Sequence, residues 1–183
     1  MYKILAINPG STSTKIAVYN QNEIEFVINL QHSSEDLAGF NSVFEQYDFR
    51  LQMILKTLSE QKINLSEISV VVGRGGLMKA LESGVYEVSE TMIQDMKTGR
   101  EHASNLGAVL ARDIASRIPG CKAYITDPVV VDELQEVARI SGLPQFPRRS
   151  VFHALNHKAI GRKYAQSISS SYEKLNLVIA HLG

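Results

Sequence analysis

The chain has 183 residues, of which 44% are hydrophobic and 21% are charged. Nineteen basic residues balance nineteen acidic ones, so no net charge favours nucleic acid or an anionic membrane as a partner. No apolar run approaches the roughly 20 residues of a membrane helix. The single cysteine, Cys121, excludes an internal disulfide and a thiolate metal cluster. We therefore expect a cytoplasmic globular protein.

The first thirty residues predict three strands joined by short turns. An apolar run over residues 3–7 ends at Asn8-Pro9-Gly10-Ser11, residues 15–20 alternate in polarity, and residues 24–30 form a third run. Strands joined by tight turns pair in antiparallel fashion, so we expect a three-stranded meander.

The spacing of apolar residues then changes to three and four, which is typical of helices. Residues 36–61 predict an amphipathic helix or a broken pair of helices, capped at Ser33 with Asp36. Further helices are expected over 103–118 and 151–169, and further strands over 69–73, 122–126 and 175–181. Helices between strands indicate parallel crossovers. The predicted fold class is therefore α/β, with a mixed five-stranded sheet flanked by helices.

The polar loop between the first two strands has the composition of a phosphate site. Gly10 lets backbone N–H groups approach an anion, the hydroxyls of residues 11–14 add donors, and Lys15 adds a positive charge. The spacing matches neither a P-loop nor a dinucleotide-binding turn. The alternative is a polar hairpin that holds no ligand.

Gly73-Arg74-Gly75-Gly76 places one arginine at the carboxyl end of a predicted buried strand. Ligands of α/β sheets bind at such ends. A guanidinium group fits a carboxylate or a phosphate through two parallel hydrogen bonds. The alternative is a glycine-rich surface turn.

Histidine and aspartate residues near the ends of other predicted elements are further candidates. His102 precedes a helix, whose N-terminus favours anions, and Asp127 directly follows a strand. Either residue could instead serve as a helix cap or start a turn. His153 and His157 share a helical face at a spacing that zinc can use. A metal-dependent hydrolase built from these four residues is one alternative function.

Six ordered segments resemble the N-terminal half of the butyrate kinase branch of the acetate kinase family, within the sugar kinase, heat-shock chaperone and actin superfamily. The segments are 8–15, 73–77, 101–107, 127–133, 148–156 and 181–183. The first loop, the residues after Arg74 and the run 152–157 follow the butyrate rather than the acetate version.

The resemblance implies a ribonuclease-H-like domain over residues 1–172 and the start of a second, nucleotide-binding domain at 173–183. Residues 5–10 and 178–183 share an apolar strand followed by a polar residue, a spacer and a glycine, as a duplicated fold would. Members of the family are about twice as long as this chain. We therefore expect a missing C-terminal domain, no turnover by this chain alone, and a homo-oligomer when the protein is complete.

The resemblance also implies phosphoryl transfer between ATP and butyrate, giving butyryl phosphate and ADP, with Mg²⁺ as cofactor. The implied catalytic residues are Arg74, Asp127 and His153, and the implied substrate-binding residues are Arg74, His102 and Phe152. The implied nucleotide- and phosphate-binding residues are Asn8, Ser11, Ser13, Lys15, His181 and Gly183, with Asn8 also acting indirectly on Mg²⁺.

The chemistry of a small carboxylate agrees with these roles. Its pKa is near that of glutamate, about 4.3, so the nucleophile is already ionised at pH 7 and needs no general base. The difficulty is to bring it to an anionic phosphate, which cations and hydrogen-bond donors relieve. On this hypothesis Asp127 orients a cation or a metal-bound water. The alternatives are an acetate or branched-chain fatty acid kinase, and a non-catalytic module for acyl-anion binding or oligomerisation.

Overall fold

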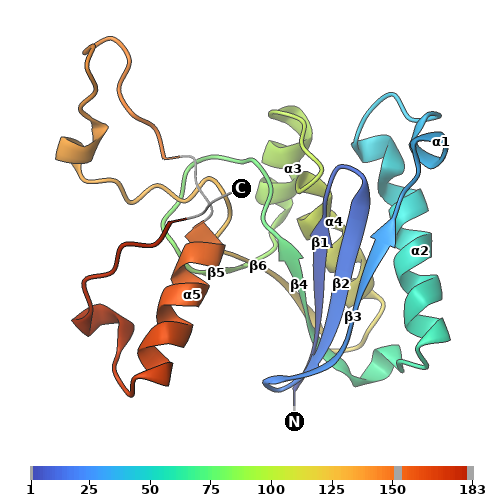
Figure 1. The fold of residues 1–183 in the computed structure, drawn as a ribbon. Helices are drawn as coiled ribbons and strands as arrows, with labels where there is room; N and C mark the ends of the chain where they lie inside the picture. The colour runs from blue at the N-terminus through green and yellow to red at the C-terminus, as the bar shows by residue number, and fades with distance from the viewer. Residues whose placement is uncertain (1, 151–153, 181–183) are drawn as a thin grey trace. The chain divides into compact units, whose positions relative to one another are not determined.

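The computed structural model describes residues 2–150 and 154–180 and divides into two compact units (Figure 1). The first unit comprises Met1–Lys79 and Gly84–Thr126, and the second comprises Ala80–Ser83 and Asp127–Gly183. These two units do not test the predicted boundary between a first domain at residues 1–172 and a second domain that starts at residue 173. That boundary stays a prediction. No helix in the described ranges is long and apolar enough to span a membrane.

A six-stranded mixed sheet forms the centre of the first unit, in the order β3-β2-β1-β4-β6-β5. The strands are β1 (Lys3–Pro9), β2 (Ser13–Asn20), β3 (Glu23–Gln31), β4 (Ile68–Arg74), β5 (Val85–Glu87) and β6 (Lys122–Thr126). The predicted antiparallel meander β1-β2-β3 is confirmed, and the predicted parallel crossovers are found in the pairs of β4 with β1 and with β6.

The prediction of five strands was one short. The missing strand is β5, which pairs in antiparallel fashion with β6 at the sheet edge. It has three residues, two of them exposed, and this is too short a stretch for alternating polarity to be recognised.

Helices α1 (Ser34–Leu37), α2 (Tyr47–Glu60), α3 (Glu90–Thr98) and α4 (Asn105–Ser116) complete the first unit, with short 3-10 helices at Phe44–Gln46 and Leu65–Glu67. The segment 36–61 is a broken pair of helices, one of the two predicted forms. Ser33 and Asp36 form the expected capping box. Helix α3 was not predicted, because only Ile93 and Met96 are buried along it and so short a pattern carries little periodicity.

The core of the first unit lies between the sheet and the helices. Its fully or almost fully buried members include Leu5, Ile7, Ile16, Val18 and Val71 from the sheet, Leu51, Ile54 and Leu58 from α2, and Leu106, Leu110 and Ile114 from α4. Each such side chain contributes about 1.5–3 kcal/mol when fully buried. Burial of alternate residues along β1 fixes its register, so the end of this strand is held in place.

The second unit contains α5 (Ala154–Ser167) and two 3-10 helices, Glu136–Arg139 and Tyr172–Lys174. The predicted helix over 151–169 is confirmed where it is described, and residues 151–153 lie outside the described residues. The predicted strand 175–181 is not formed over residues 175–180. A strand is defined by pairing, and no described strand pairs with this segment.

Glu133 ties together two parts of the second unit. Its carboxylate accepts hydrogen bonds from Lys158 Nζ at 2.7 Å and from the Ser83 N–H group at 2.8 Å. The Lys158 bond first, and the Ser83 bonds next, lower the pKa of Glu133 from 4.5 to about 2. A carboxyl group whose pKa is lower in the folded state stabilises the fold above its unfolded pKa.

The contribution of Glu133 to stability is therefore expected to decline as the pH falls from 4.5 towards 2. Glu133→Gln should lower the free energy of unfolding at pH 7, and its difference from the parent chain should shrink over this pH window. Urea denaturation at a series of pH values measures this difference. Glu136→Gln is the matched control, because Glu136 is 91% exposed in its ion pair with Arg139. Equal effects of the two substitutions at every pH would contradict the prediction.

Candidate functional site

Two predicted site residues meet at the carboxyl ends of β1 and β4. Arg74 Nη1 donates a hydrogen bond to Asn8 Oδ1 at 3.2 Å. Asn8 is also the register partner of Lys15 in β2, and directly opposed residues project from the same face of a sheet. Arg74, Asn8 and Lys15 therefore place two cationic side chains and one amide at one end of the sheet.

Helix α4 packs very closely against the end of β4 that carries Arg74. A Cβ atom at Gly73 would lie 2.1 Å from the carbonyl oxygen of Gly107, and a Cβ at Gly107 would lie 2.3 Å from that of Arg74. Real Cβ atoms do not approach backbone so closely. Both positions therefore require glycine, and this contact sets the distance between Arg74 and the start of α4.

An open pocket of about 460 Å³ adjoins Arg74 in the first unit. It is lined by Pro9, Gly10, Ser11, Val43, Gln46, Arg74, His102 and Ala103. Three of these were predicted as site residues: Ser11, Arg74 and His102. The lining combines a guanidinium group, an imidazole and a hydroxyl with the apolar side chains of Pro9, Val43 and Ala103. Such a lining fits a small anion with an apolar tail.

The His102 side chain contacts Ser104, two residues further along the chain. Its Nδ1 accepts a hydrogen bond from the Ser104 N–H group at 3.2 Å and lies 2.7 Å from Ser104 Oγ. These contacts assign the proton of the neutral ring to Nε2. The N-cap of α4 is Ser104, which forms no side-chain cap bond to the helix, so His102 does not cap it, and the residue lines the pocket.

The N-terminus of α4 is not an open anion site. The N–H groups of Asn105, Leu106 and Gly107 donate to the carbonyls of residues 102, 103 and 104 at 2.9–3.1 Å. The positive groups available to a ligand of this pocket are therefore side chains.

The polar loop at residues 10–14 is folded on itself. The Gly10 N–H group donates to the Ser13 carbonyl at 2.7 Å, and Ser11 and Thr12 are exposed. Lys15 is also exposed, whereas the Thr14 side chain is fully buried. The loop thus presents its hydroxyls at residues 11 and 12 to solvent.

Sequence reasoning missed Arg50, the largest buried polar side chain. It lies on α2, is fully buried, and donates hydrogen bonds to the loop at residues 10–14. One signal was available. Arg50 is four residues before Ile54 and eight before Leu58, so it stands on the apolar face of the helix. An arginine in that position indicates a specific buried role.

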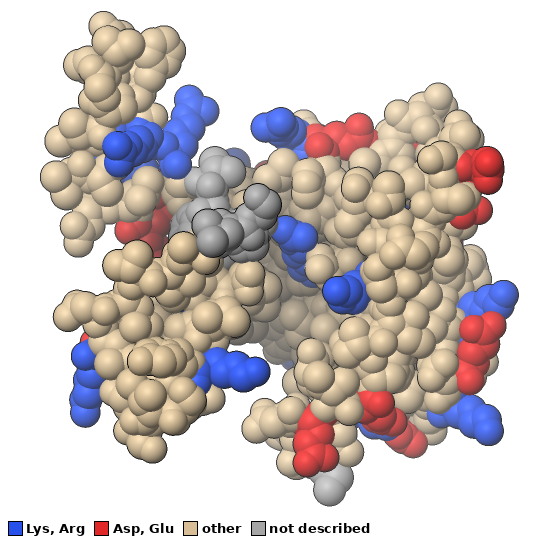
Figure 2. Space-filling view, in the orientation of Figure 1, with Lys and Arg blue, Asp and Glu red and all other residues tan. Residues whose placement is uncertain are grey.

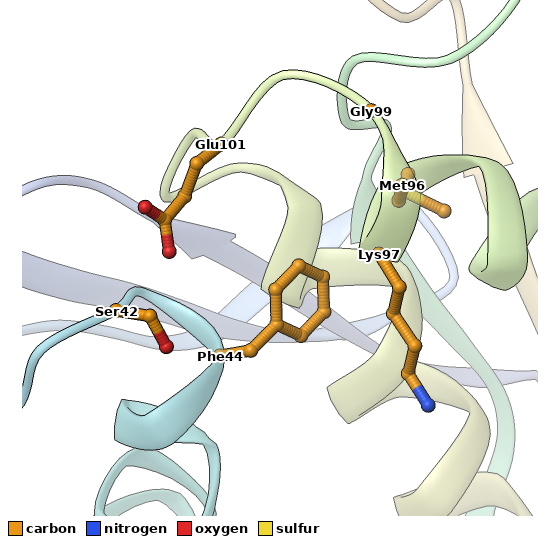
Figure 3. A pocket seen from close by; sticks show the side chains of 6 residues that line it. All are labelled: Ser42, Phe44, Met96, Lys97, Gly99 and Glu101. Carbon is orange, nitrogen blue, oxygen red and sulfur yellow. The ribbon is translucent and has the colours of Figure 1, made fainter.

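A second pocket, of about 420 Å³, is lined by the chain segments that flank the first (Figure 3). Its lining residues are Ser42, Phe44, Met96, Lys97, Gly99 and Glu101, and in Figure 3 the Lys97 amine points away from the Glu101 carboxylate. Glu101 Oε1 accepts a hydrogen bond from the Val43 N–H group at 2.5 Å. This bond joins two walls of the Arg74 pocket, because Val43 lines that pocket and Glu101 is adjacent to His102.

The positive charge near the Arg74 pocket is that of a few side chains and not of an extended basic surface. On the face of the first unit drawn in Figure 2, basic and acidic side chains are interspersed. Interspersed charges produce no broad field. The attraction of the Arg74 pocket for an anion therefore depends on the few cationic groups at the pocket itself.

Asp127 belongs to the second unit and directly follows Thr126, the register partner of Arg74. Its side chain is only 5% exposed, and Oδ2 lies 3.9 Å from Nη1 of Arg162. Its backbone is in the left-handed region, with φ at 34°, which aspartate tolerates better than most residues. The Arg162 guanidinium also lies over the Tyr172 ring, 5.8 Å from its centroid.

The remaining predicted site residues lie outside the described residues. These are Phe152, His153, His181 and Gly183. Within the described ranges, no group of three or more His, Cys, Asp or Glu residues is placed to hold a metal ion. The zinc hypothesis included His153, so it stays a hypothesis.

No protein-family model matches the chain. Over its whole length the chain is 50% identical to butyrate kinase 1 and butyrate kinase 2 of Clostridium acetobutylicum, and it spans 52% and 51% of them. It is also 50% identical over its whole length to a probable butyrate kinase of Listeria innocua, of which it spans 52%.

The fold resembles solved structures of related enzymes. With the acetate kinase of Porphyromonas gingivalis the TM-score is 0.64 at 16% identity, covering 95% of this chain and 51% of that one. With a propionate kinase of Francisella tularensis the TM-score is 0.60 at 16% identity, covering 93% and 50%. These likenesses confirm the actin-like ATPase fold. The chain is therefore a homologue of the butyrate kinases, as its motifs indicate, and it spans about half the length of these relatives.

Proposed function

We propose that this chain is the carboxylate-binding portion of a butyrate kinase, which transfers a phosphoryl group between ATP and butyrate. The observation that carries the proposal is the pocket at Arg74. There a guanidinium group stands beside an apolar wall, in a chain half of whose residues match butyrate kinases. The relatives are about twice as long as this chain, so we expect the activity to require the remainder of the protein.

The pocket offers positive charge for the carboxylate of a fatty acid and apolar side chains for its alkyl chain. Arg74 would hold the carboxylate of butyrate, or the acyl phosphate, through charge-assisted hydrogen bonds. Val43, Pro9 and Ala103 would contact the alkyl chain, and His102 would donate from Nε2 to the same anion. An ionised carboxylate needs no base, so what these residues provide is orientation and positive charge.

The residues of the second unit would act on the phosphoryl group. Asp127, with Arg162 close to its carboxylate, would orient a cation or a metal-bound water and would not take a proton. His153 would donate to the charge that spreads over the transferring phosphoryl group.

Mg²⁺ fits this site only through ATP and water. Asn8 Oδ1 already accepts a hydrogen bond from Arg74, and the adjacent guanidinium charge disfavours a cation on that oxygen. Mg²⁺ commonly keeps several waters and binds substrate phosphates. When bound, it neutralises charge on the phosphates of ATP. The proposed role of Asn8 is therefore to hold Arg74 and to contact a water of the metal.

The kinase proposal is tested by joining this chain to the part of Clostridium acetobutylicum butyrate kinase 1 that it does not match. We expect the joined protein to form butyryl hydroxamate from butyrate, ATP and hydroxylamine, and the chain alone to form none. A folded joined protein without activity would contradict the kinase proposal. If it were stabilised by butyrate without turnover, the result would favour the non-catalytic acyl-anion-binding module. Product from the chain alone would contradict only the expectation that it is inactive by itself.

Gly10 allows the loop's proposed phosphate role to be separated from its folding. Gly10 is not among the residues with positive φ, and a Cβ there would make only ordinary contacts, 3.5 Å from the oxygens of Ser13. Gly10→Ala should therefore change the free energy of unfolding by about 0.5 kcal/mol or less. The added methyl group should nevertheless weaken ATP binding to the joined protein about tenfold, because it obstructs approach to the backbone.

Thermal unfolding and calorimetric titration with ATP measure the two effects of Gly10→Ala. Gly39→Ala is the matched control, because a Cβ at Gly39 meets nothing within 4 Å. Unchanged ATP affinity in Gly10→Ala would exclude close contact between the phosphates and this part of the loop.

A further inference from the structure

Arg50 is a buried cation whose hydrogen-bond partners are all neutral. Nη1 donates to the Ser13 carbonyl at 3.0 Å and to Thr14 Oγ1 at 2.9 Å, and Nη2 donates to the Ser11 carbonyl at 3.1 Å. Both Nη2 and Nε donate to Gln46 Oε1, at 2.8 and 3.1 Å. In the part of the chain that is described, no carboxylate forms an ion pair with Arg50.

The neighbouring histidine, His32, adds no second positive charge at pH 7. Thr14 Oγ1 accepts from Arg50 Nη1 and lies 2.9 Å from His32 Nε2. Burial first, and the Arg50 charge next, lower the pKa of His32 from 6.5. Asp36 opposes the shift but lies in an exposed capping box with Ser33. At pH 7 the only full charge in this buried cluster is therefore that of Arg50.

The hydrogen bonds of Arg50 also orient the loop's donors. In a trans peptide the C=O and N–H groups point in opposite directions. Because the Ser11 carbonyl is directed inward to Arg50, the Thr12 N–H group is directed outward. Ser11 and Thr12 are both exposed, so the loop offers this N–H group and two hydroxyls to solvent. The Gly10 N–H group is already used by Ser13.

An anion bound outside the loop would balance the part of the Arg50 charge that its neutral hydrogen-bond partners leave uncompensated. An uncompensated buried cation is unfavourable, and carbonyl dipoles offset the cost only in part. The guanidinium group is within 3.1 Å of the loop backbone, so only this backbone separates it from an anion outside the loop. Solvent therefore screens their attraction little.

We propose that Arg50 is a positioning residue for anion binding at the loop of residues 10–14. It fixes the carbonyls of Ser11 and Ser13, directs the Thr12 N–H group outward, and places positive charge beneath the bound phosphate. The proposal rests on the proposed function, in which this loop receives the phosphates of the nucleotide.

The test uses the full chain with inorganic tripolyphosphate as the probe, and follows the ¹⁵N–¹H signal of the Thr12 amide during titration. Arg50→Lys keeps the charge and loses the fork, whereas Arg50→Met loses both. We expect affinity about threefold weaker in Arg50→Lys and at least tenfold weaker in Arg50→Met. The Thr12 signal of the free chain should move in both variants. The dependence of affinity on salt should become shallower only in Arg50→Met.

Ile54→Val, one turn further along α2, controls for a general loss of stability. It should lower the melting temperature and leave the affinity, the Thr12 signal and the salt dependence unchanged. A purely structural role of Arg50 would predict the same pattern for Arg50→Lys. Wild-type affinity with an unmoved Thr12 signal in Arg50→Lys would therefore overturn the proposal, even if Arg50→Met did not fold.

Failure of this proposal and failure of the proposed function give different results. If tripolyphosphate leaves the Thr12 signal of the wild-type chain unmoved while the joined protein forms butyryl hydroxamate, the Arg50 proposal is wrong and the kinase proposal stands. If the chain binds tripolyphosphate through Arg50 and the folded joined protein is inactive, the kinase proposal is wrong and the loop remains an anion site.

Discussion

Replacement of Arg74 by alanine in the joined protein is expected to lower kcat/KM for butyrate by at least 100-fold. Hydrogen bonds to a charged group are worth about 1.5–3 kcal/mol, which is roughly a 10- to 150-fold change in affinity, and the same cation would stabilise the reacting phosphoryl group. Arg74 also holds the Asn8 side chain at 3.2 Å, so its loss removes the orientation of a second site residue. The hydroxamate assay at varied butyrate concentrations measures the effect.

Arg74→Lys separates the charge of this residue from its geometry. A lysine keeps a point charge but has no planar fork, so it cannot hold a carboxylate by two parallel bonds and contact Asn8 as well. We expect activity between those of the parent and Arg74→Ala, with the loss mainly in KM for butyrate. Arg112→Ala is the matched control, because Arg112 is a partly exposed arginine of α4 that pairs with Glu90. If Arg74→Ala retained the activity of Arg112→Ala, the carboxylate role of Arg74 would be wrong.

The parts of the fold that local chemistry specifies were predictable from the sequence. Turn residues at 8–11 and the alternation in 15–20 predicted the antiparallel meander, and Ser33 with Asp36 predicted a cap that forms as a full capping box. The end of β4 at Arg74 was also predicted closely, because glycines follow a β-branched run. These features depend on neighbours along the chain.

Features that depend on contacts between distant segments were not predictable. Arg50 donates to a loop 36 to 39 residues earlier in the sequence, so its place on the apolar face of α2 could indicate burial but not its hydrogen-bond partners. Val43 and Gln46 line the Arg74 pocket but belong to no motif. The hydrogen bond between Arg74 and Asn8 was not predicted, because hydrogen bonds between side chains require the register that the folded sheet supplies.

Substitution of Gly73 by alanine is expected to lower the stability of this chain strongly. The new Cβ would lie 2.1 Å from the Gly107 carbonyl oxygen, 2.4 Å from its carbonyl carbon and 2.9 Å from the Ala108 nitrogen. All three are backbone atoms, so no side chain can rotate away. Overpacking of a core costs about 1–3 kcal/mol, and a backbone clash belongs at or above the upper end of that range.

Thermal unfolding followed by circular dichroism should show the effect of Gly73→Ala as a melting temperature lower by about 6–12 °C, because 1 kcal/mol shifts the midpoint of a chain this size by about 2–4 °C. Gly39→Ala adds the same methyl group in open space and should leave the midpoint within about 2 °C.

The Gly73 contact links the fold to the site. Relief of the clash requires α4 to move away from β4, and His102, three residues before the start of α4, would then move relative to Arg74 on β4. Gly73→Ala in the joined protein should therefore raise KM for butyrate even at temperatures where the protein stays folded. Wild-type stability together with wild-type KM would mean that α4 shifts freely on the sheet. The distance between His102 and Arg74 would then have to be fixed by contacts other than the one between Gly73 and Gly107.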